Sequence, residues 1–460
     1  MAKNATLTAI AFLLLPFALY AQNTDIEALA GINFNFGNPG ARSLGMGGAF
    51  LGLADDASAA ETNPAGLTIL RKAEVSLEGR NFRVAQDVAV SGTFPDVIND
   101  EFSEFSRRAE VAFASVVFPA GNFAFAAYYH QAVRYTNSAT VLPLFDSRGR
   151  LVQQVPNFYL PRNGAPVSLE RCLEIIGQNP GDQSACLEFR ILPFVTAVDV
   201  DLQTYGAALA WKMGTLSLGF AAKHQTFEQA AFTFREDFQG NPSSIAVQAT
   251  GTLENGQLVI DEETDITYTI GFKWAPAASL SFGGVYKTGG EFDAPTFAQV
   301  AGGTFSQLAE TTFHVPDVSG VGVSWRPMPV LTINVDAVKI DYSNLSDNFI
   351  SINEEIRALT DPFETKDVTE IHAGAEYFFA TRIPLAIRVG WWREPAHGLR
   401  YRGPIDSPQR VASAILFPGT KDQNHRSVGV GLAWPNFQLD AAYETSDSFK
   451  VGSLSGVFRF

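Results

Sequence analysis

The sequence predicts an all-β fold: a fourteen-stranded antiparallel transmembrane β-barrel with an N-terminal luminal hatch. Three observations carry this prediction. Apolar residues fall on alternate positions of many segments, the connections between these segments alternate between short and long, and aromatic residues recur just before the short connections. In closed membrane barrels, lipid-facing strands, periplasmic turns with longer extracellular loops, and an interfacial aromatic girdle give these three patterns.

The first element is a secretory signal peptide, predicted for residues 1–21. Lys3 precedes an apolar run over residues 9–19, and the small residue Ala21 precedes Gln22, where we expect the mature chain to begin. No later segment reaches the roughly 18 consecutive apolar residues that a membrane helix needs. That observation alone leaves a soluble fold open, and the alternation described above favours the barrel. A net charge of -15 argues against a nucleic-acid partner.

The second element, residues 31–71, has eight glycines and two prolines and keeps no period of 2 or 3.6. Glycine loses much backbone entropy on folding and has no side chain to bury, so this stretch cannot form a core of its own. We therefore expect residues 22–71 to fold back as a hatch inside a barrel made by residues 72–460. A phosphate-binding loop is the competing interpretation, but no Gly-Lys-Ser/Thr follows the glycines.

Three short motifs in this stretch carry a resemblance: Gly45-Met46-Gly47-Gly48-Ala49, the run over residues 54–59, and Asn63-Pro64-Ala65-Gly66-Leu67. In this order they resemble the amino-terminal hatch of FadL-type outer-membrane transporters of hydrophobic compounds and of the related PorV-like barrels. The resemblance implies that the hatch residues are Gly45, Gly47, Gly48, Asn63, Pro64, Ala65 and Gly66.

The resemblance also implies a function. The FadL-type branch implies an outer-membrane channel for passive uptake of hydrophobic small molecules such as long-chain fatty acids, with no cofactor and no enzymatic activity. The PorV-like branch implies instead a barrel that serves protein secretion or surface attachment. Asp55 and Asp56 could be read as a calcium pair, but anchoring of the hatch to luminal Arg and Lys side chains is the commoner role for such residues.

The remaining elements are fourteen candidate strands, an even number as expected for a closed bacterial barrel. They cover residues 73–90, 108–118, 122–136, 197–212, 215–234, 264–275, 278–290, 317–326, 330–342, 368–379, 383–394, 425–434, 436–445 and 450–460. The tight connections would be periplasmic turns. The long ones would be extracellular loops, over residues 91–107, 137–196, 235–263, 291–316, 343–367 and 395–424.

Aromatic residues set the orientation of these strands, because amphipathic rings are most stable at the membrane interface. The predicted periplasmic girdle is Trp211, Trp274, Trp325 and Trp434, joined by Phe118 and Tyr377. The pleat then turns Glu370, His372 and Glu376 inward, where Arg388 could pair with a carboxylate. The alternation slips over residues 337–339, which predicts a β-bulge there.

The connection over residues 137–196 is too long to be a simple link. Its two cysteines, Cys172 and Cys186, are expected to form a disulfide worth about 3 kcal/mol, the alternative being two unpaired thiols. A short amphipathic helix is predicted around Cys172. Because this connection is also rich in apolar residues, it could form a folded cap with an apolar groove. The candidate ligand-binding residues of that groove are Phe145, Phe158, Leu160, Leu173 and Ile176.

No constellation in the sequence predicts catalysis or a metal site. Six histidines are scattered without metal-ligand spacing, and neither HExxH nor GxSxG occurs. The terminal Phe460 resembles the signal that barrel-assembly machinery recognises. The expected location is the bacterial outer membrane. The expected partners are a hydrophobic small molecule, outer-membrane lipid and lipopolysaccharide, and the assembly machinery, with the barrel a monomer.

Overall fold

The computed structural model of the chain describes residues 38–89, 101–141, 144–145, 151–153, 157–161, 167, 169–178, 185–190, 194–236, 242–300, 303–346, 363–398, 400–403, 420–447 and 449–460. The predicted signal peptide, residues 1–21, and the first part of the predicted hatch, residues 22–37, lie outside these residues.

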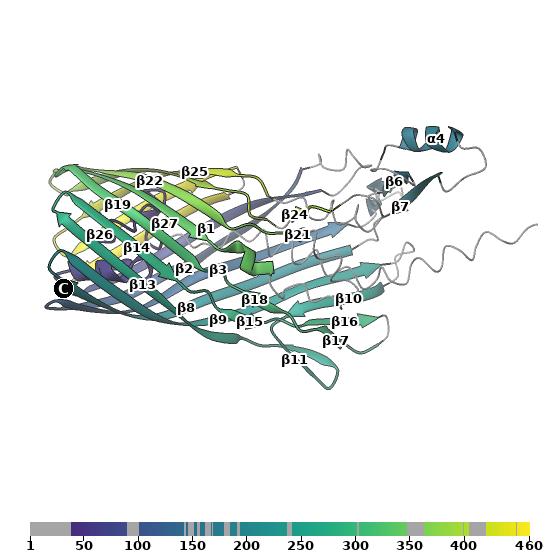
Figure 1. Cartoon of the computed structure of the whole chain (residues 1–460), viewed down its shortest axis with the longest axis horizontal. Helices are drawn as coiled ribbons and strands as arrows, with labels where there is room; N and C mark the ends of the chain where they lie inside the picture. The colour runs from purple at the N-terminus through teal and green to yellow at the C-terminus, as the bar shows by residue number, and fades with distance from the viewer. Residues whose placement is uncertain are drawn as a thin grey trace, which may run out of the picture.

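Fourteen strands form a closed antiparallel barrel, as the sequence predicts (Figure 1). Each strand pairs with its neighbours in chain order, and the ring closes where the first strand pairs with the last. The strands of the wall are β1 (Glu74–Ala89), β2 (Glu101–Ala120), β3 (Phe123–Val141), β8 (Phe194–Met213), β9 (Leu216–Glu236), β13 (Glu263–Ala277), β14 (Leu280–Lys287), β19 (Val318–Met328), β20 (Leu331–Ile340), β22 (Val368–Phe379), β23 (Leu385–Glu394), β25 (Gln423–Ala433), β26 (Phe437–Thr445) and β27 (Phe449–Arg459).

Further strands extend the long connections at one end of the barrel. β10 (Pro242–Ala249), β16 (Thr296–Val300) and β17 (Ser306–Ala309) continue the main sheet beyond β9. Separate two-stranded pairs are β4 (Leu144–Phe145) with β5 (Leu151–Gln153), β6 (Asn157–Pro161) with β7 (Cys186–Arg190), β11 (Gly251–Glu254) with β12 (Gln257–Ile260), β15 (Glu291–Asp293) with β18 (Thr312–His314), and β21 (Phe363–Glu364) with β24 (Arg400–Tyr401). We call this the outer end of the barrel.

The two faces of the wall differ in chemistry, and this difference fixes the inward and outward directions. Large apolar side chains stand exposed on the outer face, including Trp211, Trp274 and Trp325 of the predicted girdle, while Trp434 is half-buried against Phe437. Inward positions on the same strands hold buried polar groups, such as Lys273 on β13 and Ser324 on β19. On β22, Glu370, His372 and Glu376 are buried, which confirms the phase of the pleat predicted for that strand.

The helices of the described chain are short. They are α2 (Ala41–Leu44), α3 (Ala59–Thr62), α4 (Leu169–Gln178) and the 3₁₀ helices η2 (Pro64–Ile69) and η5 (Tyr342–Ser346). None of the helices in the described residues is long and apolar enough to cross a membrane.

The bulge predicted over residues 337–339 is wrong. Over residues 333–340, β20 pairs with both neighbours in unbroken register, and Lys339 faces outward while Val338 and Ile340 face inward with apolar neighbours. The pleat does not slip there. Instead, at the outer end of the strand the inward face becomes apolar and the outward face becomes polar. In the sequence, this change looks like a slip of register.

Candidate functional site

The interior of the barrel is divided into two parts along its axis. Residues 38–70, which we call the inner segment, lie inside the wall, away from the outer end (Figure 1). At the outer end, the inward side chains form an apolar cluster covered by elements of the long connections. The two parts are held by different interactions, and together they form the candidate functional site.

The inner segment crosses the barrel from one wall to the opposite one. Its α2 lies against β25, β26 and β27, whereas α3 and η2 lie against β3, β8, β9 and β13 on the other side of the ring. Small and apolar residues of the segment pack on the inward alanines of β3 and β8. The segment therefore spans the bore at the level of α2 and η2.

The first glycine motif is explained by close approach to the wall. Gly47 and Gly48 take φ values of +64° and +75°, a backbone conformation that favours glycine. A Cβ atom on Gly47 would also lie 2.7 Å from the backbone nitrogen of Trp391 in β23. The Gly47 N–H donates to Ser427 Oγ at 3.0 Å, so the turn is tied to the wall at the point of contact.

In the third motif, Asn63 caps η2 and Pro64-Ala65-Gly66 begin it. The Asn63 side-chain amide donates to the carbonyl oxygens of Leu51 at 3.2 Å and of Phe272 in β13 at 3.0 Å, and its oxygen accepts from the Ala65 N–H. Pro64 occupies the first helical position, where its missing N–H is not needed. Gly66 does not take a positive φ; its role is space, because a Cβ atom there would collide with the Ala54 carbonyl.

The wall contributes glycines of its own where the inner segment touches it. A Cβ atom would collide with the segment's backbone at Gly219, Gly283, Gly374 and Gly390, which lie on β9, β14, β22 and β23. Glycine is normally unfavourable inside a strand, and close approach of another backbone is one reason for its presence. These wall glycines therefore mark where the inner segment lies.

A chain of buried ion pairs fixes the segment. Arg42 of α2 contacts Glu376 of β22 at 2.9 Å and Asp55 at 2.6 Å, and Asp55 in turn contacts Arg326 at 3.0 Å. Arg388 of β23 binds the same Glu376 at 2.7 Å and Asp440 of β26 at 2.7 Å. The pairing of Arg388 with an inward carboxylate, and the contact of Asp55 with basic side chains, agree with the expectations from sequence.

Further polar anchors hold the backbone of the segment. Asp336 of β20 accepts from the Phe50 and Leu51 N–H groups at 2.6 and 2.7 Å. Lys273 of β13 donates to the Leu53 carbonyl, and Lys287 of β14 pairs with Glu61 at 3.0 Å. The described residues contain no group of three or more His, Cys, Asp or Glu side chains placed to hold a metal ion.

A row of stacked rings lies on the inner wall above the ion pairs. His372, Trp392 and His425 occupy opposed positions on the adjacent strands β22, β23 and β25, so Trp392 is stacked between the two imidazoles. His372 Nδ1 donates to the Gly47 carbonyl at 2.7 Å, which links the row to the inner segment. His425 lies between the carboxylates of Glu394 and Glu444 at 2.9 and 3.1 Å.

The apolar cluster fills the outer part of the interior. It consists of Val133, Val198, Val200, Leu202, Phe227, Ala231, Phe292, Phe313, Val315, Val318, Ile340, Tyr342, Leu345, Val368 and Tyr401. Phe227 of β9 stacks on Phe292 and Phe313, with ring centroids 4.8 and 4.6 Å apart. Because Phe292 and Phe313 come from the β15–β18 pair and Tyr342 from η5, the long connections close over the outer end of the barrel with apolar side chains.

A polar band separates the apolar cluster from the inner segment. It is formed by His130, Lys223, Gln225, Thr267 and Thr269, which are buried inward residues on β3, β9 and β13. Within the described residues, His130 Nε2, Gln225 Oε1 and both threonine hydroxyls have no hydrogen-bond partner. Buried polar atoms are rarely left unpaired, so these atoms indicate a place for water or for a polar group of a ligand.

The ligand-binding residues predicted from sequence lie elsewhere, in the connection between β3 and β8. Phe145 belongs to β4 and Phe158 and Leu160 to β6, but their side chains are outside the described part of the structure. Leu173 of α4 is 58% exposed, and Ile176 packs with Tyr159 in a small cluster separate from the apolar cluster. The ligand-binding role of these five residues remains a prediction.

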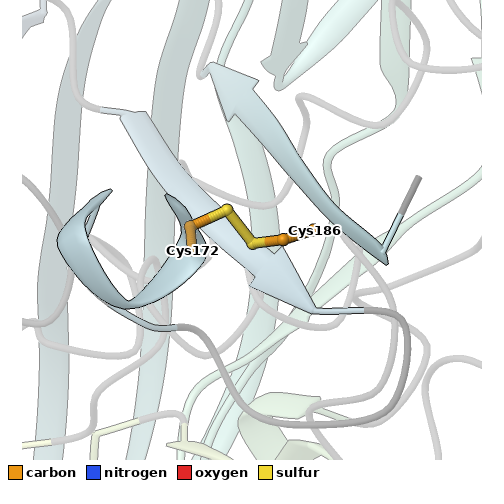
Figure 2. The surroundings of a disulfide bond; sticks show 2 residues. All are labelled: Cys172 and Cys186. Atoms are coloured by element: carbon orange, nitrogen blue, oxygen red, sulfur yellow. A yellow bond between two sulfur atoms is a disulfide. The ribbon is translucent and has the colours of Figure 1, made fainter. Parts of the chain in front are cut away.

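The cap that carries these residues is held by a disulfide between Cys172 of α4 and Cys186 of β7, with their Cα atoms 5.6 Å apart (Figure 2). α4, β6 and β7 lie beyond the outer end of the barrel (Figure 1). The bridge therefore joins parts of the cap to each other and does not join the cap to the wall.

Sequence reasoning missed the apolar cluster. Two signals could have found it: the phenylalanines Phe292 and Phe313 inside a connection, and the apparent slip of alternation near Ile340, where the inward face becomes apolar. The polar anchors gave a clearer signal, because charged residues at inward positions of a membrane strand need partners.

Neither a protein-family model nor a curated protein sequence matches the chain. Solved structures do. The chain is similar to a Pseudomonas aeruginosa FadL homologue, at 14% identity over 90% of this chain and 97% of that one, with a TM-score of 0.55. It is also similar to the P. putida toluene transporter TodX, at 12% identity over 92% and 99%, TM-score 0.55. A third is the Ralstonia pickettii toluene transporter TbuX, at 14% identity over 93% and 99%, TM-score 0.52.

These likenesses extend over nearly the whole length of each chain and show that the protein has the fold of FadL-type transporters of hydrophobic compounds.

Proposed function

We propose that the protein is an outer-membrane channel for passive entry of hydrophobic small molecules. The observation that carries the proposal is the apolar cluster inside the barrel, built by inward side chains of β8, β9, β19 and β20 and by the connections above them. A water-filled porin has a polar interior, and this outer part does not. The transporter descriptions of similar structures add support.

The energetics favour such a solute. An apolar molecule that leaves water for the cluster gains about 25 cal/mol for each Å² of apolar surface that it buries. A hydrophilic solute gains nothing there and loses its hydration. The outer half of the interior would therefore select by hydrophobicity, without any energy source.

The inner segment would act as the hatch of this channel. It spans the bore, and its ion pairs with Glu376 and Arg326 hold it across the path between the apolar cluster and the other end of the barrel. Residues 22–71 as a hatch domain, and residues 72–460 as the barrel domain, belong to this proposal.

Long-chain fatty acids are the solutes that the polar band favours. Phe227 lies two residues from Gln225 and four from Lys223 on the inward face of β9, so an apolar chain in the cluster would place its polar end at the band. Lys287 is paired with Glu61, and the carboxylates that act on Lys223 are Glu61 and Asp317. The band thus offers the ammonium group of Lys223 and unpaired hydrogen-bonding atoms that a carboxylate could use.

The decisive experiment is oleate uptake and binding by the variant Phe227→Asp. A charge in the apolar cluster should abolish binding, because burying an unpaired carboxylate costs several kcal/mol. The matched control is Leu173→Asp, which places the same charge on the exposed cap. Loss of oleate binding in Leu173→Asp with normal binding in Phe227→Asp would move the site to the cap and contradict the proposal.

The fatty-acid preference has a separate test. Lys223→Met should weaken uptake of palmitate and leave uptake of hexadecane, a hydrocarbon of equal length, unchanged. If both change equally, the polar band does not recognise a head group, and the wider class of hydrophobic solutes still stands.

The rival function, a PorV-like role in protein secretion or surface attachment, is tested by deleting residues 40–66. A channel should then admit small hydrophilic solutes and show altered oleate uptake. Unchanged oleate uptake, at equal amounts of barrel in the membrane and with impaired delivery of a surface protein, would favour the rival.

Membrane orientation is tested by single cysteines. Asn255, exposed in the β11–β12 turn, should label from outside intact cells once it is replaced by cysteine, and Gly214 and Thr381 at the opposite end should not. Labelling at all three positions would contradict the proposed location. Recognition by assembly machinery and the monomeric state remain predictions.

A further inference from the structure

Basic residues form a row on the outer surface of the wall, on one side of the barrel. The row consists of Arg426 on β25, Lys450 on β27 and Arg83 on β1, and all three side chains are exposed. Each lies at an outward position of its strand, in line with exposed apolar residues such as Val428, Leu454 and Leu77.

The register of the sheet brings these three residues into one line. Arg426 is opposite Thr445 on β26, Thr445 is opposite Lys450, and Lys450 is opposite Arg83. With strands about 4.8 Å apart, the row extends about 15 Å from Arg426 to Arg83. Long, flexible side chains at this spacing can converge on one multiply charged group.

The row lies at the border of the exposed apolar surface that faces the outer end of the barrel. Arg426 is eight residues from Trp434 of the periplasmic girdle, which is about 27 Å along the strand and about 21 Å in height for a strand tilted by about 40°. The apolar band of such barrels is about 25 Å tall. The exposed aromatic rings of Trp391 and Tyr443 lie on the strands beside Arg426, as expected at a membrane interface.

The other walls differ at this level. Eight residues before Trp211, Trp274 and Trp325, the chain has Gln203, Ile266 and Asp317, none of which is basic. Lys339, an exposed cation near the outer end of β20, is instead matched by the carboxylates of Asp341 and Asp367. In the described residues, no ion pair or hydrogen bond joins the side chain of Arg426 or Lys450 to another residue.

We propose that this row binds the phosphate groups of a phosphorylated glycolipid in the outer leaflet of the membrane. The inference rests on the membrane location in the proposed function, but not on any solute. A net charge of -15 makes the chain repel anionic lipid in general, so a local row of cations at headgroup height is a specific attraction. Arginine binds phosphate oxygens with two parallel N–H donors, and apolar columns beneath the row suit acyl chains.

The test measures binding of bisphosphorylated lipid A to the full chain purified in detergent micelles. The test variant is the double substitution Arg426→Gln and Lys450→Gln. The control variant, Arg400→Gln with Lys421→Gln, removes two exposed cations from the connection between β23 and β25. We expect about a thirtyfold loss of lipid A affinity in the test variant, or about fivefold for each charge, and no loss in the control.

A second ligand identifies the recognised group. Lipid A from which both phosphates have been removed should bind wild type and test variant equally and weakly. The proposal is overturned if the test variant binds bisphosphorylated lipid A as wild type does, as it would if the row served an acidic protein. It is also overturned if the control variant loses as much affinity. Oleate uptake by the test variant should equal that of wild type, so failure here leaves the channel proposal untouched.

Discussion

The two halves of the barrel interior are built by the same strands but in opposite ways. Near the inner segment, inward positions carry charges that are paired, as in Arg388 between Glu376 and Asp440. At the outer end, inward positions on the same sheet are apolar and come together as the stacked rings around Phe227. Along β20, the change from Asp336 to Ile340 takes four residues.

This contrast shows what each half is suited to. Directional hydrogen bonds and ion pairs hold a segment in one position, because each bond is lost when its partner moves. Apolar contacts are non-directional, so one greasy molecule can replace another there at little cost. A fixed half around the inner segment and an adaptable half at the outer end agree with the proposed channel and its hatch.

Removing Arg388, which belongs to the ion-paired half, should cause the largest loss of stability. Arg388→Leu leaves Asp440 and part of Glu376 buried without their cation, which typically costs 3–5 kcal/mol. We expect the urea midpoint of the barrel in lipid vesicles to fall markedly. Arg382→Leu, at an exposed turn, should change it by less than about 0.5 kcal/mol. If both variants have the same urea midpoint, the ion pairs of Arg388 do not stabilise the part of the barrel that holds the inner segment.

The disulfide should have the next largest effect, confined to the cap. Cys172→Ser with Cys186→Ser should destabilise the cap by about 3 kcal/mol, as expected for a closed loop of about 15 residues. Hydrogen exchange should rise in α4, β6 and β7 and stay unchanged in β9 and β22. Faster exchange in β9 or β22 would show that the cap also stabilises the wall of the barrel.

A methyl group on Gly390 should displace the inner segment at moderate cost. Gly390→Ala forces a Cβ atom into the backbone at Gly47, and overpacking of this kind typically costs about 1–3 kcal/mol. We expect small hydrophilic solutes to pass through the reconstituted barrel. The matched control is Gly452→Ala, where nothing lies within 4 Å of the added Cβ atom. Equal solute passage in both variants would contradict the assigned contact.

Acid should have the smallest effect, at the outer rim. A hydrogen bond from Arg393 and another from the Ala396 N–H lower the pKa of Asp422. Because the folded state favours the ionised carboxylate, its contribution is present at neutral pH and is lost as the pH falls below about 4. The pair is exposed, so the change should stay below about 1 kcal/mol. Exchange protection of Ala396 should fall with acid in wild type, and in Asp422→Asn it should be low at every pH.

Most of the wall could be predicted from sequence because lipid imposes strict alternation. An unpaired charge on the outer face of a strand costs a few kcal/mol, so residues such as Glu370, His372 and Glu376 could only face inward. All fourteen strands were found within a few residues of their ends, except that β2 begins at Glu101 and not at residue 108, and β3 ends at Val141 and not at residue 136.

The site was harder to predict because its partners are distant in the chain. The ligand residues proposed for the cap rested on local apolar patterning, whereas the apolar cluster joins Phe227, Phe313 and Tyr401 from three separate connections and strands. The wall glycines, such as Gly283 and Gly374, likewise have no pattern of their own. Their role depends on where the inner segment lies, and periodicity within one strand does not contain that information.

The position of α2 also predicts an order of assembly. The Ala41 N–H donates to Ser455 Oγ, a residue 414 positions away, whereas Thr68 of η2 meets Ser217 of β9 after 149 positions. Closing a longer loop costs more entropy and is slower, so η2 should dock on the early strands well before α2 finds β27. Since β27 is also the strand that pairs with β1, the seating of α2 and the closure of the ring depend on the same last hairpin. We therefore expect the inner segment to be bound at η2 before the barrel closes. The alternative order, in which a closed barrel takes up the segment afterwards, is not expected.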